Sequence, residues 1–301
     1  MSRRGWLLFV VMSIVWGIPY LLIKVAVEDV AVPVVVFARV AMGGLLLLPF
    51  ALRNGGVRTV LRRWRPVVAF TLLELVGPWF FLTDAERTLP SSLAGLLIAT
   101  VPVLGAIAVR LTGGTERLGR TRLAGLLVGL GGVAVLVAPT LRGGDAWPTV
   151  EVLLTAVGYA VAPLIVIRYL DDVPGLPLTA VSLSLAALLY APAAIVTWPD
   201  TRPEPSVLGA IAALGLVCTT AAFLVYFALI REVGPVRATV FTYVNPAVAV
   251  LAGVVVLGER LTLLIGVAFV LILIGSVLAT SRERPSTPAV TGGNAVGSGV
   301  G

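Results

Sequence analysis

The chain of 301 residues contains no histidine, a single cysteine and few charged side chains. The absence of histidine removes the commonest metal ligand and the side chain that usually shuttles protons near neutral pH. The single cysteine, Cys218, excludes an internal disulfide and a cysteine metal cluster. Charged residues make up 12% of the chain, about half their share in a soluble domain. We therefore expect no metal site and no cofactor.

Apolar residues take the place of the missing charges. They form 58% of the chain, and the mean hydropathy is +1.05. A helix needs about 20 apolar residues to cross ~30 Å of hydrocarbon. Ten segments approach or reach this length: 6–26, 33–52, 66–83, 91–111, 121–138, 148–168, 176–197, 206–230, 236–256 and 261–280. The predicted fold is an all-α integral membrane protein with ten transmembrane helices.

The distribution of positive charge predicts the orientation of these segments. With the N-terminus inside, the inner connections receive 16 of the Lys and Arg residues, the outer ones receive five, and Arg39 lies within a segment. Cytoplasmic connections carry the excess of Lys and Arg in membrane proteins. The acids Glu28, Asp84, Glu86 and Glu259 fall on the outer side. The net charge of +7 thus indicates orientation, with both termini cytoplasmic, and not nucleic-acid binding.

The chain repeats itself at an interval of about 144 residues. Three pairs of prolines are 144 residues apart: Pro19 and Pro163, Pro33 and Pro177, and Pro102 and Pro246. The tripeptide Glu-Arg-Leu recurs at 116–118 and 259–261. Each copy holds five predicted helices, and because five is odd the second copy enters the membrane from the opposite side. Such inverted-topology repeats are typical of secondary transporters.

This repeat defines the expected organisation of the chain. Residues 1–138 are predicted to form the first five-helix repeat and residues 139–281 the second, inverted one. The remaining residues, 282–301, are rich in Pro, Gly, Ser and Thr, a composition that favours a disordered tail, here cytoplasmic.

Several stretches resemble the EamA family of the drug/metabolite transporter superfamily. They are "VWGIPYLLIKVA", "FARVAMGGLLLLP", "TLPSSLAGLLIATVPVLGAI", "GTERLGRTRLAGLLVGLGGV" and "TVFTYVNPAVAVLAGVVVLGERLTLLIGVAFVLILIG". The likeness covers residues 6–280. It implies a ten-helix bundle that moves small metabolites, and family substrates include amino acids, nucleotide-like metabolites and toxic compounds.

Two charged residues lie well inside the predicted helices, Arg39 and Glu74. A charge in hydrocarbon costs about 2.5–3.5 kcal/mol on insertion scales, so each needs a partner or a function. We expect them to pair, or to face one polar cavity. A structural ion pair and a substrate or proton site are equally good interpretations. Without histidine, Glu74 is the best candidate for proton coupling, since burial favours its protonated form.

Prolines, aromatics and polar groups complete the candidate cavity. A proline within a helix frees a backbone carbonyl, which is tolerated in a membrane where it is buried or lines a cavity. Trp79 and Tyr226 lie nearer segment ends, which favours interfacial anchors. The candidate substrate-binding residues are Trp16, Tyr20, Arg39, Glu74, Thr100, Pro102, Tyr159, Tyr243, Asn245 and Pro246.

Two further patterns have structural interpretations. In "LAGLLVGLGG" the residues Gly125, Gly129, Gly131 and Gly132 predict close helix packing. The acids of the two Glu-Arg-Leu turns are expected to complement the dipoles of the helices that follow them.

These observations favour an inner-membrane secondary transporter, not an enzyme. We expect it to export a small metabolite, such as an amino acid, by alternating access. A flippase for a lipid-linked molecule and an uptake permease of the same fold are the alternatives. An intramembrane enzyme would need clustered catalytic groups at depth, and none is present in the sequence. The expected partners are a small-molecule substrate and the lipid bilayer, with no nucleic acid; a homodimer is left open.

Overall fold

The computed structural model describes residues 1–53, 55–112, 119–141 and 146–280, and they form helices and turns with no strand among them. Each of the ten predicted segments corresponds to one helix or to a run of consecutive helices. The predicted tail at 282–301 and the Glu-Arg-Leu turn at 116–118 lie outside the described residues.

The first half of the chain contains nine α-helices and one π-helical turn among its described residues. They are α1 (Arg3–Val15), α2 (Pro19–Ala26), α3 (Val32–Arg53), α4 (Val57–Arg62), α5 (Trp64–Thr71), η1 (Leu72–Val76), α6 (Gly77–Ala85), α7 (Ser91–Ile98), α8 (Val101–Leu111) and α9 (Arg120–Leu141). The short α4 lies in a connection and was not predicted.

The second half follows the same order. Its elements are α10 (Trp147–Tyr169), α11 (Gly175–Val196), α12 (Pro205–Gly215), η2 (Leu216–Ala221), α13 (Ala222–Val233), α14 (Pro235–Ala238), η3 (Thr239–Tyr243), α15 (Asn245–Leu257) and α16 (Leu263–Thr280).

By length and composition, eight helical stretches of the described chain can cross a membrane, and two shorter apolar helices, Asn245–Leu257 and Leu263–Ala279, follow them. Large apolar side chains are exposed along these stretches, among them Leu45 (74%), Val196 (85%) and Leu263 (86%). In hydrocarbon a helix satisfies all of its own backbone groups, which explains why even the valine-rich α3 is helical.

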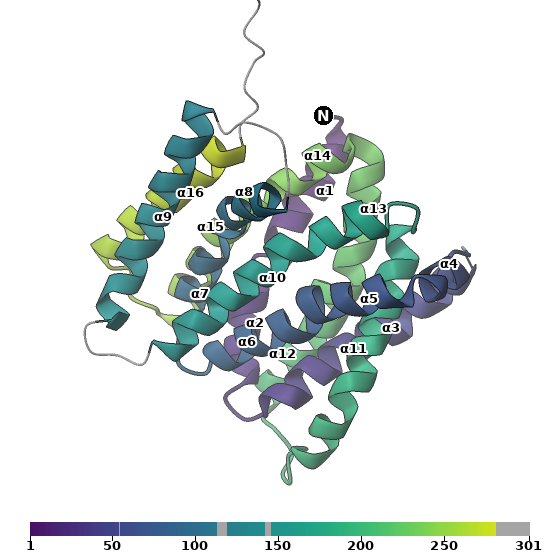
Figure 1. Cartoon of the computed structure of the whole chain (residues 1–301). Helices are drawn as coiled ribbons and strands as arrows, with labels where there is room; N and C mark the ends of the chain where they lie inside the picture. The colour runs from purple at the N-terminus through teal and green to yellow at the C-terminus, as the bar shows by residue number, and fades with distance from the viewer. Residues whose placement is uncertain (54, 113–118, 142–145, 281–301) are drawn as a thin grey trace, which may run out of the picture.

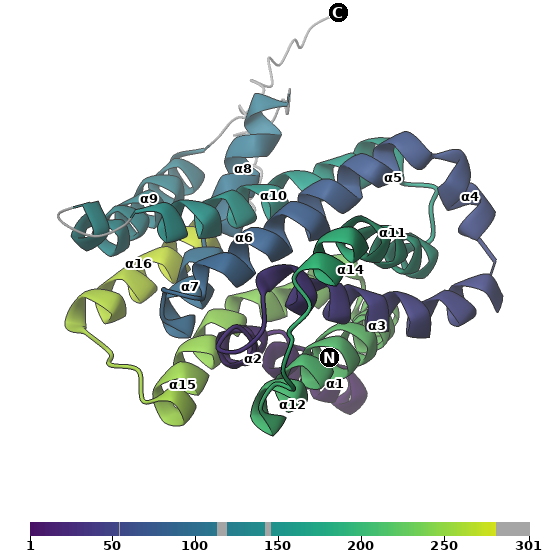
Figure 2. The ribbon, with the colours of Figure 1, turned by 90° about the horizontal axis from the view of Figure 1, so that it is seen from below.

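The helices pack in pairs drawn from the two halves (Figures 1 and 2). The pair α9 and α16 lies at one end of the molecule, and the pair α3 and α11 lies at the other. Between them α7 packs on α15, α6 packs on α10, and α2 packs on α12. The central elements are therefore held between two outer helix pairs.

Glycines bring α9 and α16 close together. A Cβ added at Gly125 would lie 2.4 Å from the Ala279 nitrogen, and one added at Gly275 would lie 2.3 Å from the Gly129 nitrogen. Gly132 is similarly close to Ile272, whereas Gly131 has open space around it. The predicted close packing is confirmed for three of the four glycines.

Three helical runs are interrupted near their middles. Residues 16–18 separate α1 from α2, residues 99–100 separate α7 from α8, and η3 precedes α15. Pro19, Pro102 and Pro246 each lie in the first turn after an interruption. A proline there costs no hydrogen bond, because the first N–H groups of a helix have no partner within it.

Two other runs contain a π-helical turn, η1 and η2, at positions 144 residues apart. Just after η1, Pro78 has no N–H to donate to the Glu74 carbonyl, four residues before it. The Gly77 N–H bonds to the Leu72 carbonyl, five residues before it. In η2, the hydroxyls of Thr219 and Thr220 donate to the carbonyls of Leu214 and Gly215, five residues back. Such turns often occur at functional sites.

Candidate functional site

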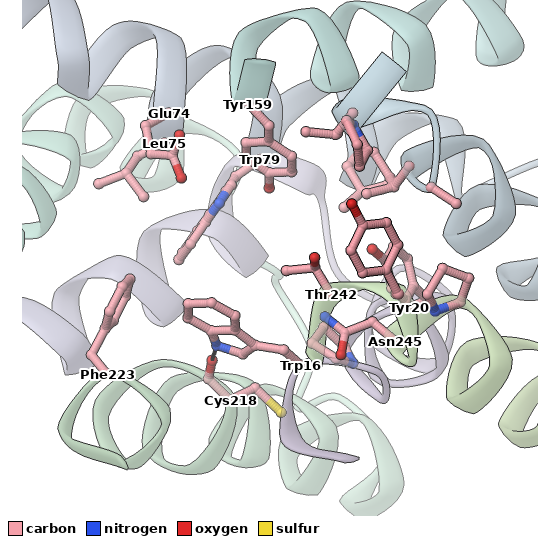
Figure 3. A pocket seen from close by; sticks show the side chains of 18 of the residues that line it. Trp16, Tyr20, Glu74, Leu75, Trp79, Tyr159, Cys218, Phe223, Thr242 and Asn245 are labelled. Carbon is pink, nitrogen blue, oxygen red and sulfur yellow. Dashed lines mark hydrogen bonds between the residues drawn. The ribbon is translucent and has the colours of Figure 1, made fainter. Parts of the chain in front are cut away.

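A cavity of about 280 Å³ lies where the interrupted helices and the π-helical turns meet. It is lined by residues of the interruptions at 16–18 and 99–100 and by residues from α2, α3, η1, α6, α7, α8, α10, η2, α13, η3, α15 and α16. Figure 3 shows Glu74, Tyr159 and Trp79 on one side, with Trp16 and Phe223 across from them. Of the ten predicted residues, Thr100 alone does not line it.

Arg39, on α3, supplies positive charge to this cavity. Its side chain is 8% exposed. Its Nε donates to the Thr219 hydroxyl at 3.0 Å, and its guanidinium carbon lies 3.6 Å from the centre of the Trp79 ring. Among the described residues no acid lies within 4 Å of Arg39, and its Nη groups have no acceptor. The side chain is thus fixed at one edge, with a guanidinium fork left for a ligand.

Glu74, in the π-helical turn η1, supplies the opposite charge. Its Oε2 is buried and has no hydrogen-bond partner among the described residues. The structure therefore contains no Arg39–Glu74 ion pair, and the alternative expectation holds, in which both face one cavity. The two groups do not neutralise each other by direct contact, so each can meet a group of a ligand.

The walls between these charges are aromatic. Trp16 donates its indole N–H to the Cys218 carbonyl at 3.2 Å and packs against Phe223 and Phe241. Trp79 lies in the cavity wall and is 6% exposed, so its prediction as an interfacial anchor was wrong. The prediction rested on the position of Trp79 near a segment end. It did not account for the π-helical turn η1, which rotates the residues that follow it about the helix axis.

Tyr226 is neither an interfacial anchor nor a cavity residue. Its ring packs 5.3 Å from Trp16 and 6.0 Å from Phe241, measured between ring centres. Tyr226 therefore packs against the cavity-lining Trp16 without lining the cavity itself. Four other tryptophans lie exposed near segment ends, where interfacial anchors are typical: Trp6, Trp64, Trp147 and Trp198.

Asn245 and Thr100 hold the interrupted backbone. The Asn245 amide nitrogen, oriented to satisfy its neighbours, donates to the carbonyls of Ser13 at 3.2 Å and Phe241 at 3.1 Å. In a regular helix the Gly17 N–H would donate to the Ser13 carbonyl. Here it donates to the Ile14 carbonyl, so the Ser13 carbonyl is available to Asn245. The Thr100 hydroxyl is buried and donates to the Leu97 carbonyl at 2.7 Å. Thr100 therefore shapes the break beside the cavity without lining it.

Sequence reasoning missed several cavity residues besides Trp79, among them Leu75, Cys218 and Phe223. A signal was present, since Glu74 and Cys218 are 144 residues apart, as are Trp79 and Phe223. Applying the repeat interval to the first candidate, Glu74, would have pointed to the same place in the second half.

A second polar group lies at the far end of α6, outside the cavity. Glu86 has 0% exposure, although its position in a connection gave no sign of burial. Burial raises the pKa of Glu86 well above its usual value; Lys24 opposes this shift and Glu259 adds to it.

Glu259 differs from its expected role. Its carboxylate accepts from the backbone N–H groups of Ser91 at 2.7 Å and Ser92 at 3.0 Å, so it caps α7, not the following helix α16. The left-handed Gly258 turns the chain back toward α7. Burial raises the pKa of Glu259, but the hydrogen bonds from Ser92 and Ser91 outweigh burial and bring that pKa below its usual value.

The model of the EamA-like transporter family matches the chain twice, over residues 3–138 and residues 148–281. The chain belongs to the EamA-like transporter family. This EamA-like chain is 30% identical to the uncharacterized inner membrane transporter YedA of Escherichia coli K12, over 92% of the chain and 91% of YedA. An uncharacterized transporter of Archaeoglobus fulgidus is 22% identical and is covered completely.

A crystal structure supports the fold of the EamA-like chain. It covers 93% of this chain and 97% of its own, with 26% sequence identity and a TM-score of 0.65. The resemblance inferred from the sequence is confirmed. The protein is a membrane transporter, and the cavity at its centre is the candidate substrate site.

Proposed function

We propose that this EamA-like protein is an inner-membrane secondary transporter that exports a small metabolite, an amino acid or a similar molecule, by alternating access. The observation that carries the proposal is one cavity that contains an arginine without an acid partner and a carboxyl oxygen without a donor. Buried polar groups are normally hydrogen-bonded, so a ligand that meets both groups completes the site.

The chemistry of the cavity favours a zwitterion. A guanidinium fork binds a carboxylate with two parallel hydrogen bonds, which assigns Arg39 to the anionic end of the substrate. Glu74 takes the ammonium end. The aromatic walls at Trp16, Trp79 and Tyr159 accommodate an apolar side chain and attract the cationic group through their ring faces.

Alternating access is supported by the two halves of the molecule. The family model matches each half separately. The helices pair across the halves, α3 with α11, α7 with α15 and α9 with α16, and the π-helical turns lie at equivalent positions. Two inverted five-helix repeats, 1–138 and 139–281, can rock about a site at their interface.

Contacts between connections support a ten-helix topology with both termini cytoplasmic. Each contact joins two connections that the charge pattern assigns to the same face. On the inner face they are Ser2 with Glu232 and Arg63 with Asp172; on the outer face they are Asp29 with Glu204 and Ser91 with Glu259. An extra or missing crossing would bring opposite faces together.

Glu74 is our candidate for proton coupling in the cavity. A carboxyl group that binds the substrate ammonium when ionised releases it on protonation, so substrate and proton compete for one site. This arrangement couples export to proton entry without histidine.

The first experiment measures thermal stabilisation of the purified protein by a panel of ligands at pH 6 and pH 8. The panel contains amino acids with apolar and aromatic side chains, each with its decarboxylated amine and its deaminated acid. The variants are Arg39→Met and Glu74→Gln, with the exposed Glu28→Gln as the control. We expect an amino acid to stabilise the wild type more than either analogue.

The variants assign each end of the ligand. With Arg39→Met the amino acid and its amine should stabilise equally, and with Glu74→Gln the amino acid and its deaminated acid should do so. A ligand that stabilises all variants equally would place the site elsewhere. Counterflow of that ligand in oriented liposomes then separates export from uptake, and no flux of any panel member would refute the proposed function.

A further inference from the structure

Glu86 is a buried acid without a partner outside the central cavity. It follows α6 directly, one residue beyond the candidate span that ends at Ala85. Its side chain is 0% exposed, and neither Oε1 nor Oε2 has a hydrogen-bond partner among the described residues. It is not among the residues that line the cavity.

The nearby ammonium group of Lys24 does not bind this carboxyl group. Its Nζ donates to three backbone carbonyls, those of Glu86 at 2.8 Å, Leu89 at 3.1 Å and Arg87 at 3.4 Å. An ammonium has three N–H donors, so all three hold α2 on the turn between α6 and α7. The Glu86 carboxyl group therefore lies beside a positive charge that is fully engaged.

The other charges around Glu86 have mixed signs. Lys24 on α2 and Arg39 on α3 favour the ionised carboxylate, whereas Glu259 before α16 disfavours it. Further titratable groups on neighbouring elements and on its own segment include Tyr20 on α2, Glu151 and Tyr159 on α10, and Asp84 and Arg87. An ionised carboxylate without a donor is costly to bury. Removing the charge by protonation avoids this cost, and burial shifts the pKa in the same direction.

We propose that Glu86 is a proton-binding site, and that its proton keeps Lys24 on the turn at residues 86–89. On release, the carboxyl proton passes to water and leaves a carboxylate. That carboxylate draws the Lys24 ammonium away from the three carbonyls, which frees α2 from the α6–α7 turn. In a transporter as proposed above, the proton is then a coupling ligand bound at a second site, on the predicted outer face.

The test is the pH dependence of thermal unfolding of the full-length purified protein between pH 5 and pH 9. A group that holds a proton in the folded state and loses it in the unfolded state stabilises less as the pH rises. We expect Tm of the wild type to fall by roughly 2–4 °C across this range on account of Glu86. Glu86→Gln should remove this part of the fall, and the exposed Glu28→Gln should leave it unchanged.

A second variant keeps the test decisive if Glu86→Gln does not fold. Lys24→Met removes the charge that opposes protonation, so the midpoint of the fall should move to higher pH, by about one unit. A wild-type fall that persists in Glu86→Gln, or a midpoint that Lys24→Met leaves unmoved, would overturn the proposal. Neither measurement needs a transported substrate, so their failure leaves the proposed transport intact, and an absence of flux leaves the proton site intact.

Discussion

Residues 3–138 and residues 148–280 place a π-helical turn at equivalent positions, Leu72–Val76 and Leu216–Ala221. The residues that these turns carry to the cavity differ in chemistry. Glu74 in the first turn corresponds to Cys218 in the second, 144 residues later, and Arg39 corresponds to the apolar Leu183. The halves therefore share a backbone design, while the two cavity charges both come from the first half.

The halves also differ in one backbone feature. The α1–α2 run is interrupted at residues 16–18, whereas α10 continues through the equivalent Pro163. Gly17 lets Val248 approach the interruption, since an added Cβ would lie 2.4 Å from the Val248 Cβ. The residue equivalent to Gly17 in α10 is Val161. Two halves with equivalent helices can thus form an asymmetric cavity, because the repeat preserves the positions of the helices more closely than the side chains they carry.

The largest effect is expected for Arg39→Gln, which removes a cavity charge that the first half has and the second half lacks. Truncating one member of a buried charge pair costs about 2–5 kcal/mol, so we expect binding of the stabilising zwitterion to weaken on the order of 100-fold. Calorimetric titration of the purified variant measures this loss. Leu183→Met, at the equivalent position of the second half, should bind normally. Unchanged affinity in Arg39→Gln would remove the arginine from the site.

Gly17→Ala tests the backbone difference. Overpacking at a tight contact costs about 1–3 kcal/mol, and we expect Tm to fall by roughly 6 °C. Val161→Ala at the equivalent position of α10 should change Tm much less, because that side chain is only partly buried. Equal effects in thermal unfolding would mean that the interruption does not depend on glycine.

Glu259→Gln compares the two acids near the predicted outer face, Glu86 and Glu259. Loss of a charged cap costs about 1 kcal/mol, so Tm at pH 7 should fall by roughly 3 °C. Because the pKa of Glu259 is lowered in the fold, its contribution is present above the usual Glu pKa of about 4.3 and is lost as the pH falls through the lower value.

The pH dependence separates the two acids. The Tm difference between the wild type and Glu259→Gln should shrink in acid, because the stability contributed by Glu259 is lost as the pH falls, whereas the stability contributed by Glu86 is lost as the pH rises. Asp200→Asn, at an exposed acid, is the control and should match the wild type. A difference that grows in acid would contradict the capping role.

Thr219→Val gives the smallest expected effect. The variant removes the hydroxyl that accepts from Arg39 and donates to Leu214. At about 0.6 kcal/mol per interhelical hydrogen bond, ligand binding should weaken by roughly threefold. Thr220→Val is the matched control, since that hydroxyl donates to Gly215. Equal binding in both variants would show that Arg39 is positioned by Trp79 alone.

Much of the lining of the candidate cavity was predictable because charges in a membrane segment are few. Nine of the ten predicted residues line the cavity, since an apolar chain leaves few groups able to serve a polar ligand. The predictions failed where a turn changes direction. Trp79 follows a π-helical turn that hydropathy does not reveal, and Glu259 follows a left-handed glycine that sends it to another helix.

The sequence by itself determined that the chain is helical and membrane-embedded, because uninterrupted apolar segments must satisfy their backbone internally. It also contained the 144-residue repeat and the two charges within segments. Tertiary structure decided that Arg39 and Glu74 share a cavity without pairing, and that Glu86 is buried without a donor. These outcomes depend on contacts between residues far apart in the chain, such as Arg39 with Thr219 and Lys24 with the 86–89 turn, and local sequence patterns do not specify such contacts.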